Sequence, residues 1–329
     1  MRRATRVASL AAGIALMTGC GTPSQQDQAG GTEVVATTTI WADVARQVVQ
    51  CSGSGRVTTL MPLGADPHDY SPSAKDVATM VGADLVVANG LGLEEGLSSA
   101  LESASQDGAR VVEIAPQLQP IEFGAGAGRS DGDDHADRDE EADRDGEADG
   151  DGEHSLDPHV WLDANRVASA AALIGEELAE LTGTDRYRSC GQEVKGQMEE
   201  LHEEVGVTLA RVPEERRVLI TDHDAFGYFA EAYGYEVAGA VIPGGSTLAE
   251  PSSAEMAELA ETLRSKGVDA IFANTANPQA LVNALATEVG QVKVVDLFVG
   301  SLGGPGSGAE DYRGLMTTNA QRIFEALSS

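Results

Sequence analysis

Short β-branched runs alternate with helical patterns along this chain, and this alternation constrains the fold more than any other feature. In the first half, strands are expected at residues 33–39, 56–61, 83–89 and 110–115, with helices at 41–50, 73–81 and 94–104. In the second half, strands are expected at 217–222, 236–242, 268–273 and 292–298, with helices at 225–233, 254–265, 278–289 and 311–327. Strands that alternate with helices of this length indicate parallel sheets, so we predict an α/β protein.

Two longer helical patterns lie between these halves. The first covers 164–181 and ends at Gly183, a suitable residue for a helix C-terminus. The second covers 185–211 and repeats apolar residues at three- and four-residue spacing. Its length and amphipathic pattern predict a helix that links two lobes. We therefore expect an N-terminal lobe at 33–183, a linker helix at 184–211 and a C-terminal lobe at 212–329.

An acidic insert at residues 124–155 interrupts the first lobe. Its central part, 129–153, consists almost entirely of Asp, Glu, Gly and Arg. Such a segment cannot bury enough apolar surface to order itself, so we predict a solvated, disordered loop. The insert also contains His135 and His154 among many carboxylates, and the alternative is a loop that gathers metal weakly beside a main site.

The first 19 residues have the pattern of a secretion signal. A basic start precedes an apolar run at 7–17 that is too short to span a membrane. The ending Leu16-Met17-Thr18-Gly19-Cys20 resembles the bacterial lipoprotein cleavage box, which implies that Cys20 is lipidated. Acyl chains would then anchor the protein in the lipid bilayer, at the extracytoplasmic face of the cytoplasmic membrane. Residues 20–32 are polar and predict a flexible tether.

Two cysteines remain once Cys20 is set aside. Cys51 and Cys190 are an even pair in an exported protein, so we predict a disulfide between them, with two buried thiols as the alternative. The formal net charge of −31 argues against a nucleic-acid partner, which would require a basic face.

Three histidines lie in similar surroundings, each where an apolar run gives way to a loop or a helix start. His68 is in Gly-Ala-Asp-Pro-His-Asp-Tyr-Ser, His159 in Leu-Asp-Pro-His-Val-Trp-Leu-Asp, and His223 in Leu-Ile-Thr-Asp-His-Asp-Ala-Phe. Ligands bind beyond the carboxyl ends of parallel strands, and imidazole is a good zinc donor, so these histidines could form one metal site in a cleft between the lobes. Carboxylates that could orient the imidazole rings are Asp69, Asp157, Asp163 and Asp224. The alternative is that each histidine is a loop or cap residue.

These three motifs, together with Leu-Phe-Val-Gly-Ser-Leu-Gly and the tail Tyr-Arg-Gly-Leu-Met-Thr-Thr-Asn, resemble the zinc/manganese-type (cluster A-I) solute-binding proteins of ABC importers. The resemblance runs from about residue 33 to the C-terminus. It implies two α/β lobes joined by one rigid helix, with His68, His159 and His223 as the metal ligands. It also implies that an ABC permease and its ATPase are the partners, and we expect a monomer.

The resemblance bears on the choice of metal. Manganese-preferring members of the family place a carboxylate at the position of His223, whereas zinc members place a histidine there. Three nitrogen donors also favour zinc, so we predict Zn²⁺ as the transported ion, with manganese as the alternative. Many members have an Asp as fourth ligand where this chain has Gly300. We expect a water in that place; Asp296 is the other candidate, although a structural hydrogen bond is the simpler role for it.

Two other classes of function are also compatible with three histidines in an exported chain. A zinc hydrolase also combines three histidines with a bound water, but the chain shows no HExxH-type pairing, and we do not expect an enzyme. A lipid-anchored adhesin or scaffold with an incidental metal is the third possibility.

Overall fold

The computed structural model describes residues 31–124, 156–290 and 292–328. From Thr32 onward these residues form one compact unit. The predicted signal peptide, Cys20 and most of the tether lie outside the described residues, as does the acidic insert apart from Gly124. Among the described helices, none is both long and apolar enough to cross a membrane.

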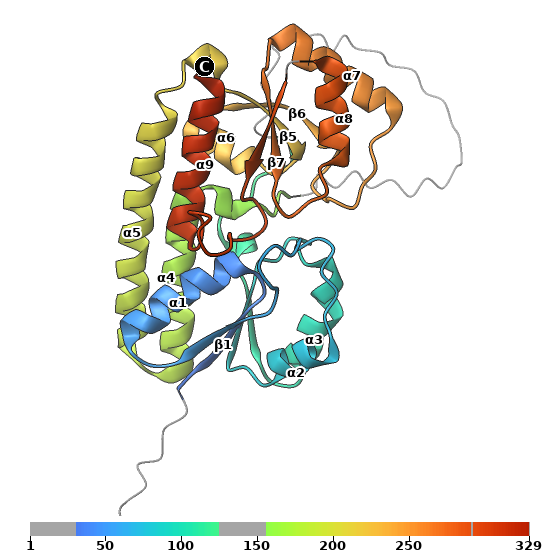
Figure 1. Ribbon diagram of the computed structural model, residues 1–329. Helices are drawn as coiled ribbons and strands as arrows, with labels where there is room; N and C mark the ends of the chain where they lie inside the picture. Colours follow the sequence, from blue (N-terminus) through green and yellow to red (C-terminus); the bar gives the residue numbers. More distant parts are fainter. Residues whose placement is uncertain (1–30, 125–155, 291, 329) are drawn as a thin grey trace, which may run out of the picture. The chain divides into compact units, whose positions relative to one another are not determined.

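The first lobe contains a four-stranded parallel sheet with the strand order β2-β1-β3-β4 (Figure 1). Its strands are β1 (Glu33–Ala36), β2 (Arg56–Thr59), β3 (Leu85–Ala88) and β4 (Arg110–Glu113). Its helices are α1 (Thr39–Ser52), α2 (Ala74–Val81) and α3 (Ser98–Gln106). Every residue of β3 is buried, whereas the edge strand β2 alternates between exposed and half-buried residues. This is the burial expected for an inner and an outer strand of a covered parallel sheet.

The second lobe contains a parallel sheet of the same kind, with the strand order β6-β5-β7-β8. Its strands are β5 (Val218–His223), β6 (Glu236–Ile242), β7 (Ala270–Asn274) and β8 (Lys293–Leu297). Its helices are α6 (Gly227–Tyr233), α7 (Ser253–Lys266), α8 (Ala280–Val289) and α9 (Tyr312–Leu327). The prediction of two parallel-sheet α/β lobes is confirmed.

Local sequence signals explain most of the boundaries. Ser73 caps α2 in a capping box with Asp76, as its spacing predicts, and Ser252 does the same for α7. The expected strand at 33–39 ends early, at Ala36, because the Thr38 hydroxyl accepts the Trp41 N–H and caps α1. Helix α1 therefore begins two residues before its predicted start.

Helices α4 (Ala164–Thr182) and α5 (Asp185–Leu209) form a tight hairpin that turns at Gly183, whose φ of 68° suits a left-handed cap. A Cβ added at Gly175 would meet the Gly191 Cα at 2.8 Å, so the backbones of the two helices touch there. Helix α5 contacts α1 of the first lobe and α9 of the second, and Figure 1 shows it running beside both lobes. Its course fits the prediction of a linker helix.

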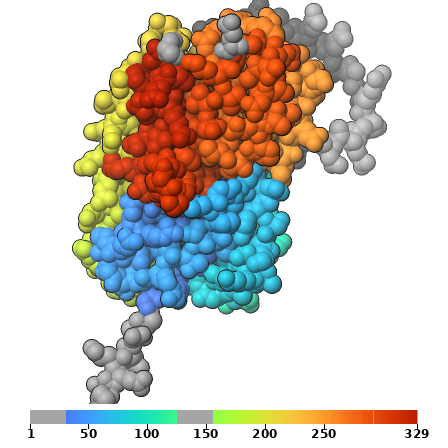
Figure 2. All heavy atoms as spheres, in the orientation of Figure 1, coloured from blue at the N-terminus to red at the C-terminus, as the bar shows by residue number. Residues whose placement is uncertain are grey.

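One large apolar core connects the two lobes through these helices. It includes Val34 and Trp41 from the first lobe, Leu201 from α5, and Phe229 and Leu315 from the second lobe. Figure 2 shows side chains of both lobes packed against each other on one face. Because the core is shared, we expect large hinge movements between the lobes to be costly.

The predicted disulfide is present. Cys51 at the end of α1 is bonded to Cys190 in α5, with the two sulfur atoms 2.03 Å apart. The alternative of two unpaired thiols is therefore wrong. The bridge ties the first lobe to the linker helix.

Candidate metal centre

The structure brings the three predicted histidines together. His68 lies in the loop after β2, His159 just before a short 3₁₀ turn at Val160–Leu162, and His223 at the end of β5. One ring nitrogen from each lies within 4.8 Å of those of the other two, and all three residues are buried. The Nε2 atoms of His68 and His159 are 3.2 Å apart. The three rings thus converge from distant parts of the chain.

Burial sets the protonation of the two histidines from the first half of the chain. Burial above all, together with the charges of the neighbouring His159 and His223, lowers the pKa of His68 to about 3. Burial, with the charge of His223, also places the pKa of His159 well below its usual value. Both rings are therefore neutral near pH 7, which is the form that binds a metal ion.

Two aspartates hold the Nδ1 atoms of His159 and His223. Asp157 Oδ1 accepts hydrogen bonds from His159 Nδ1 at 2.8 Å and from its backbone N–H at 2.9 Å. Asp222 Oδ1 accepts the corresponding bonds from His223, both at 3.0 Å. In the neutral form of each ring, Nδ1–H donates to the aspartate oxygen and Nε2 keeps its lone pair for a metal.

The Asp222 carboxylate is itself held by two further hydrogen-bond donors. Its second oxygen accepts hydrogen bonds from the Asn274 backbone N–H at 3.0 Å and from Asn277 Nδ2 at 3.1 Å. Burial alone would lower the pKa of His223, but the charge and hydrogen bond of Asp222, together with the charges of Asp66 and Asp224, raise it overall. Asp157 has fewer donors, and its burial raises its pKa to about 7. Asp157 and Asp222 therefore differ in charge as well as in their hydrogen-bond partners.

Comparison with known proteins shows to which family the chain belongs. The family model described as "Zinc-uptake complex component A periplasmic" matches residues 34–326. The chain belongs to this family of metal-binding substrate-binding proteins of ABC transporters. The zinc-binding protein TroA of Treponema pallidum is 31% identical over 306 residues, covering 90% of this chain and 88% of TroA. The manganese-binding lipoprotein MntA of Bacillus subtilis is 30% identical over 338 residues, covering 99% of this chain and all of MntA.

The fold agrees with that of a solved family member. The structure of the periplasmic zinc-binding protein TroA from Treponema pallidum matches with a TM-score of 0.76 and 30% identity. The match covers 91% of this chain and 99% of the TroA chain. It confirms the predicted membership of the zinc/manganese-type solute-binding family and its two-lobed fold.

The predicted carboxylate partners of the histidines are only partly right. Asp157 supports His159 as expected. Asp69 is exposed, and Asp163 caps α4 by accepting the Asn165 N–H. Asp222 was missed because His223 has an aspartate on each side, and the sequence does not indicate which one turns toward the ring. The prediction chose the wrong one, Asp224.

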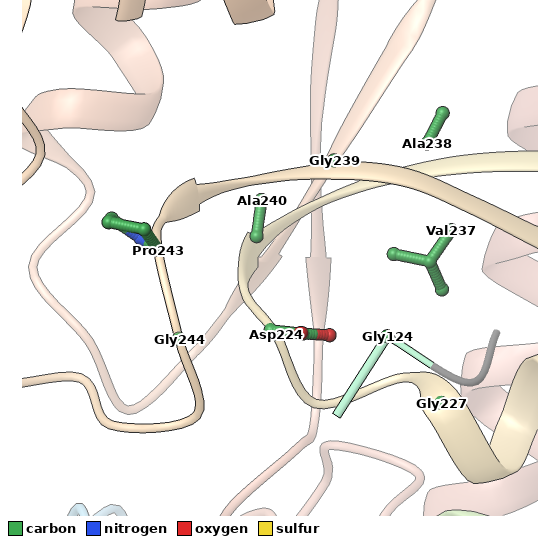
Figure 3. Close-up of a pocket in the computed structure, with 9 residues that line it drawn as sticks. All are labelled: Gly124, Asp224, Gly227, Val237, Ala238, Gly239, Ala240, Pro243 and Gly244. Carbon is green, nitrogen blue, oxygen red and sulfur yellow. The ribbon is translucent and has the colours of Figure 1, made fainter. Parts of the chain in front are cut away.

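Asp224 faces a separate hollow. A cavity of about 270 Å³ is lined by Gly124, Asp224, Gly227, residues 237–240 of β6, Pro243 and Gly244. Figure 3 shows the Asp224 side chain extending beneath β6 toward Gly124. None of the three histidines lines this cavity. A second cavity, of about 210 Å³, is lined by Phe123 and Gly245 among others, and it reaches one histidine of the cluster, His68.

No protein carboxylate completes the cluster among the residues that the structure describes. Gly300 packs against Pro67, and a Cβ at position 300 would meet the proline Cδ at 2.9 Å. Asp296 is exposed and accepts a hydrogen bond from Gln279 Nε2 at 2.6 Å. Asp296 thus has the structural hydrogen bond that was its simpler expected role, and a water as fourth ligand stays a prediction.

Proposed function

We propose that this protein binds one zinc ion outside the cytoplasm through His68, His159 and His223. It then delivers the ion to the membrane permease and ATPase of an ABC importer. The observation that carries the proposal is the convergence of three buried imidazoles, two of which have their Nδ1–H groups held by Asp157 and Asp222. This leaves three nitrogen lone pairs for one ion, with a water as the fourth ligand.

Zinc is the better fit among the candidate ions. Relatives of similar identity are named for zinc in Treponema pallidum and for manganese in Bacillus subtilis, so the family alone does not select the ion. A set of three imidazoles without a carboxylate favours Zn²⁺ over Mn²⁺, which binds nitrogen donors more weakly and prefers oxygen. Manganese is therefore the second candidate.

We further propose that the protein acts as a lipid-anchored monomer with lobes at 33–183 and 212–329 and a linker helix at 184–211. Cys20 would carry the anchor. Replacing Cys20 with Ala should move the protein from the membrane fraction to the soluble fraction of the cell envelope. Retention of this variant in the membrane would contradict the anchor.

Zinc binding is tested by elemental analysis and by calorimetric titration against a competing chelator. The protein without its signal peptide should bind one zinc per chain tightly, and manganese much more weakly. A protein that binds no zinc, or prefers manganese in the same competition, would contradict the proposal. A second tight zinc that disappears on deletion of residues 129–153 would show that the acidic insert takes part.

A further inference from the structure

A single hydroxyl of the second lobe fastens the segment that carries His159. Tyr228, the second residue of α6, is fully buried. Its Oη accepts the Ile121 backbone N–H at 3.1 Å and donates to the Asp157 backbone carbonyl at 2.6 Å. Ile121 and Asp157 lie before and after the acidic insert, in the first lobe. Tyr228 therefore completes backbone hydrogen bonds that the first lobe does not make by itself.

The two stretches that Tyr228 joins are also paired with each other. The Asp157 N–H donates to the Ile121 carbonyl at 2.8 Å, and Glu122 forms an antiparallel bridge with Leu156. From Asp157 the contacts continue to the site, because its carboxylate accepts the His159 Nδ1–H. A continuous set of contacts thus leads from the Tyr228 hydroxyl to one predicted metal ligand.

The position of Tyr228 itself is well defined. It follows His223 by five residues, so the same short stretch of chain carries a second predicted ligand. The Arg166 guanidinium lies over its ring, 4.6 Å from the centroid. A Cβ at the neighbouring Gly227 would come within 2.9 Å of Asp157 Oδ2, so the start of α6 fits closely against Asp157. Burial raises the pKa of Tyr228 to about 12, and its hydroxyl stays protonated.

We propose that Tyr228 is a positioning residue of the metal centre, which fixes the His159 imidazole relative to His223 through Asp157. This role rests on the proposed zinc binding. Without the hydroxyl, Asp157 would keep its pairing with Ile121 but lose its attachment to α6. The geometry between the two imidazoles would then loosen, although neither ligand nor its carboxylate is changed.

The test compares two tyrosine variants of the same lobe. Tyr228→Phe keeps the ring over Arg166 and removes only the hydroxyl. The matched control is Tyr235→Phe, which removes a buried hydroxyl that donates to the Leu209 carbonyl at 3.1 Å, at the end of α5. Zinc affinity is measured by chelator competition, and the unfolding midpoint of the zinc-free protein by circular dichroism.

We expect Tyr228→Phe to weaken zinc binding by about tenfold, the lower end of the effect of removing outer partners of a metal ligand. Tyr235→Phe should lower the unfolding midpoint to a similar degree and leave zinc affinity unchanged. An unchanged affinity in Tyr228→Phe, or an equal loss in both variants, would overturn the positioning role. A wild-type protein that binds no zinc would overturn the proposed function and this role with it.

A double-mutant cycle tests the route through Asp157. If Tyr228 acts on His159 through Asp157, the combination of Tyr228→Phe with Asp157→Ala should weaken zinc binding by less than the product of the two single effects. Effects that simply multiply would show that the two residues act independently. That result would contradict the proposed route.

Discussion

The two lobes share one strand order but place their histidines differently. In each sheet the second strand lies at the edge and the first strand lies beside it. The first lobe supplies His68 from the loop after its second strand, whereas the second lobe supplies His223 from the end of its first strand. At the end of its own first strand, the first lobe has Thr37, which donates to Glu94. The shared topology therefore brings the ligands to the carboxyl ends of the strands, and the sequence decides which strand carries the histidine.

His223 of the second lobe and His68 of the first also differ in how they are held. His223 is fixed by Asp222, which is fixed in turn by Asn274 and Asn277. His68 is held by its backbone, which donates to Asp66, and among the described residues no hydrogen bond to its Nδ1 is found. We infer that His223 of the second lobe is a rigid ligand, whereas His68 of the first lobe is an adjustable one.

The largest expected effects come from removing the ligands themselves. His68→Ala, His159→Ala and His223→Ala should each weaken zinc binding by orders of magnitude, more than the 10- to 100-fold typical of outer partners. His68→Ala should be the mildest of the three, because its ring is the least fixed. Chelator competition measures this order, with His202→Ala, outside the cluster, as the control. A His202→Ala effect as large as the others would contradict the assignment.

Replacing the aspartates that hold His223 and His68 should affect zinc affinity to different degrees. Asp222→Asn replaces an oxygen that accepts two N–H donors with an amide group, so we expect a 10- to 100-fold loss of zinc affinity. Asp66→Asn changes a carboxylate that accepts hydrogen bonds from the His68 backbone N–H and the Thr247 hydroxyl, without contacting the ring of a histidine through any hydrogen bond within the described residues, so its effect should be much smaller. Equal losses in the two variants would remove the distinction between a rigid and an adjustable ligand.

The pH dependence should follow the histidine of the second lobe. The pKa of His223 is raised above 6.5, whereas the pKa values of His68 and His159 are lowered. As pH falls through the raised pKa, a proton competes with zinc at His223, and affinity should fall about tenfold per pH unit. In Asp222→Asn the decline should begin at lower pH, because the charge that raises the pKa is gone. Identical pH profiles for the two proteins would contradict this cause.

The smallest effect is expected at the end of β8. Asp296→Ala removes an exposed carboxylate whose hydrogen-bond partner is Gln279, so zinc affinity should stay unchanged in the same titration. A loss similar to that of a histidine variant would instead make Asp296 the fourth ligand. In that case the second lobe would supply two ligands to the ion.

Local patterns were sufficient for the fold, and they indicated the three histidines as candidates, whose role as metal ligands the family resemblance implies. Strand and helix periodicity placed both sheets, and the Ser73–Asp76 spacing marked the start of α2. Three similar histidine motifs marked residues that the structure brings together. The support of these histidines depends on side-chain direction and on distant contacts. Asp222 could not be distinguished from Asp224, and Tyr228 bonds a carbonyl 71 residues away, which no local pattern encodes.

The most direct test of the metal centre is X-ray absorption spectroscopy of the zinc-loaded protein. We predict three imidazole nitrogens at about 2.0–2.1 Å from the zinc, with one further light atom from water. The His68→Ala variant should lose one imidazole from this signal. A spectrum with fewer than three imidazoles in the wild-type protein would contradict the account.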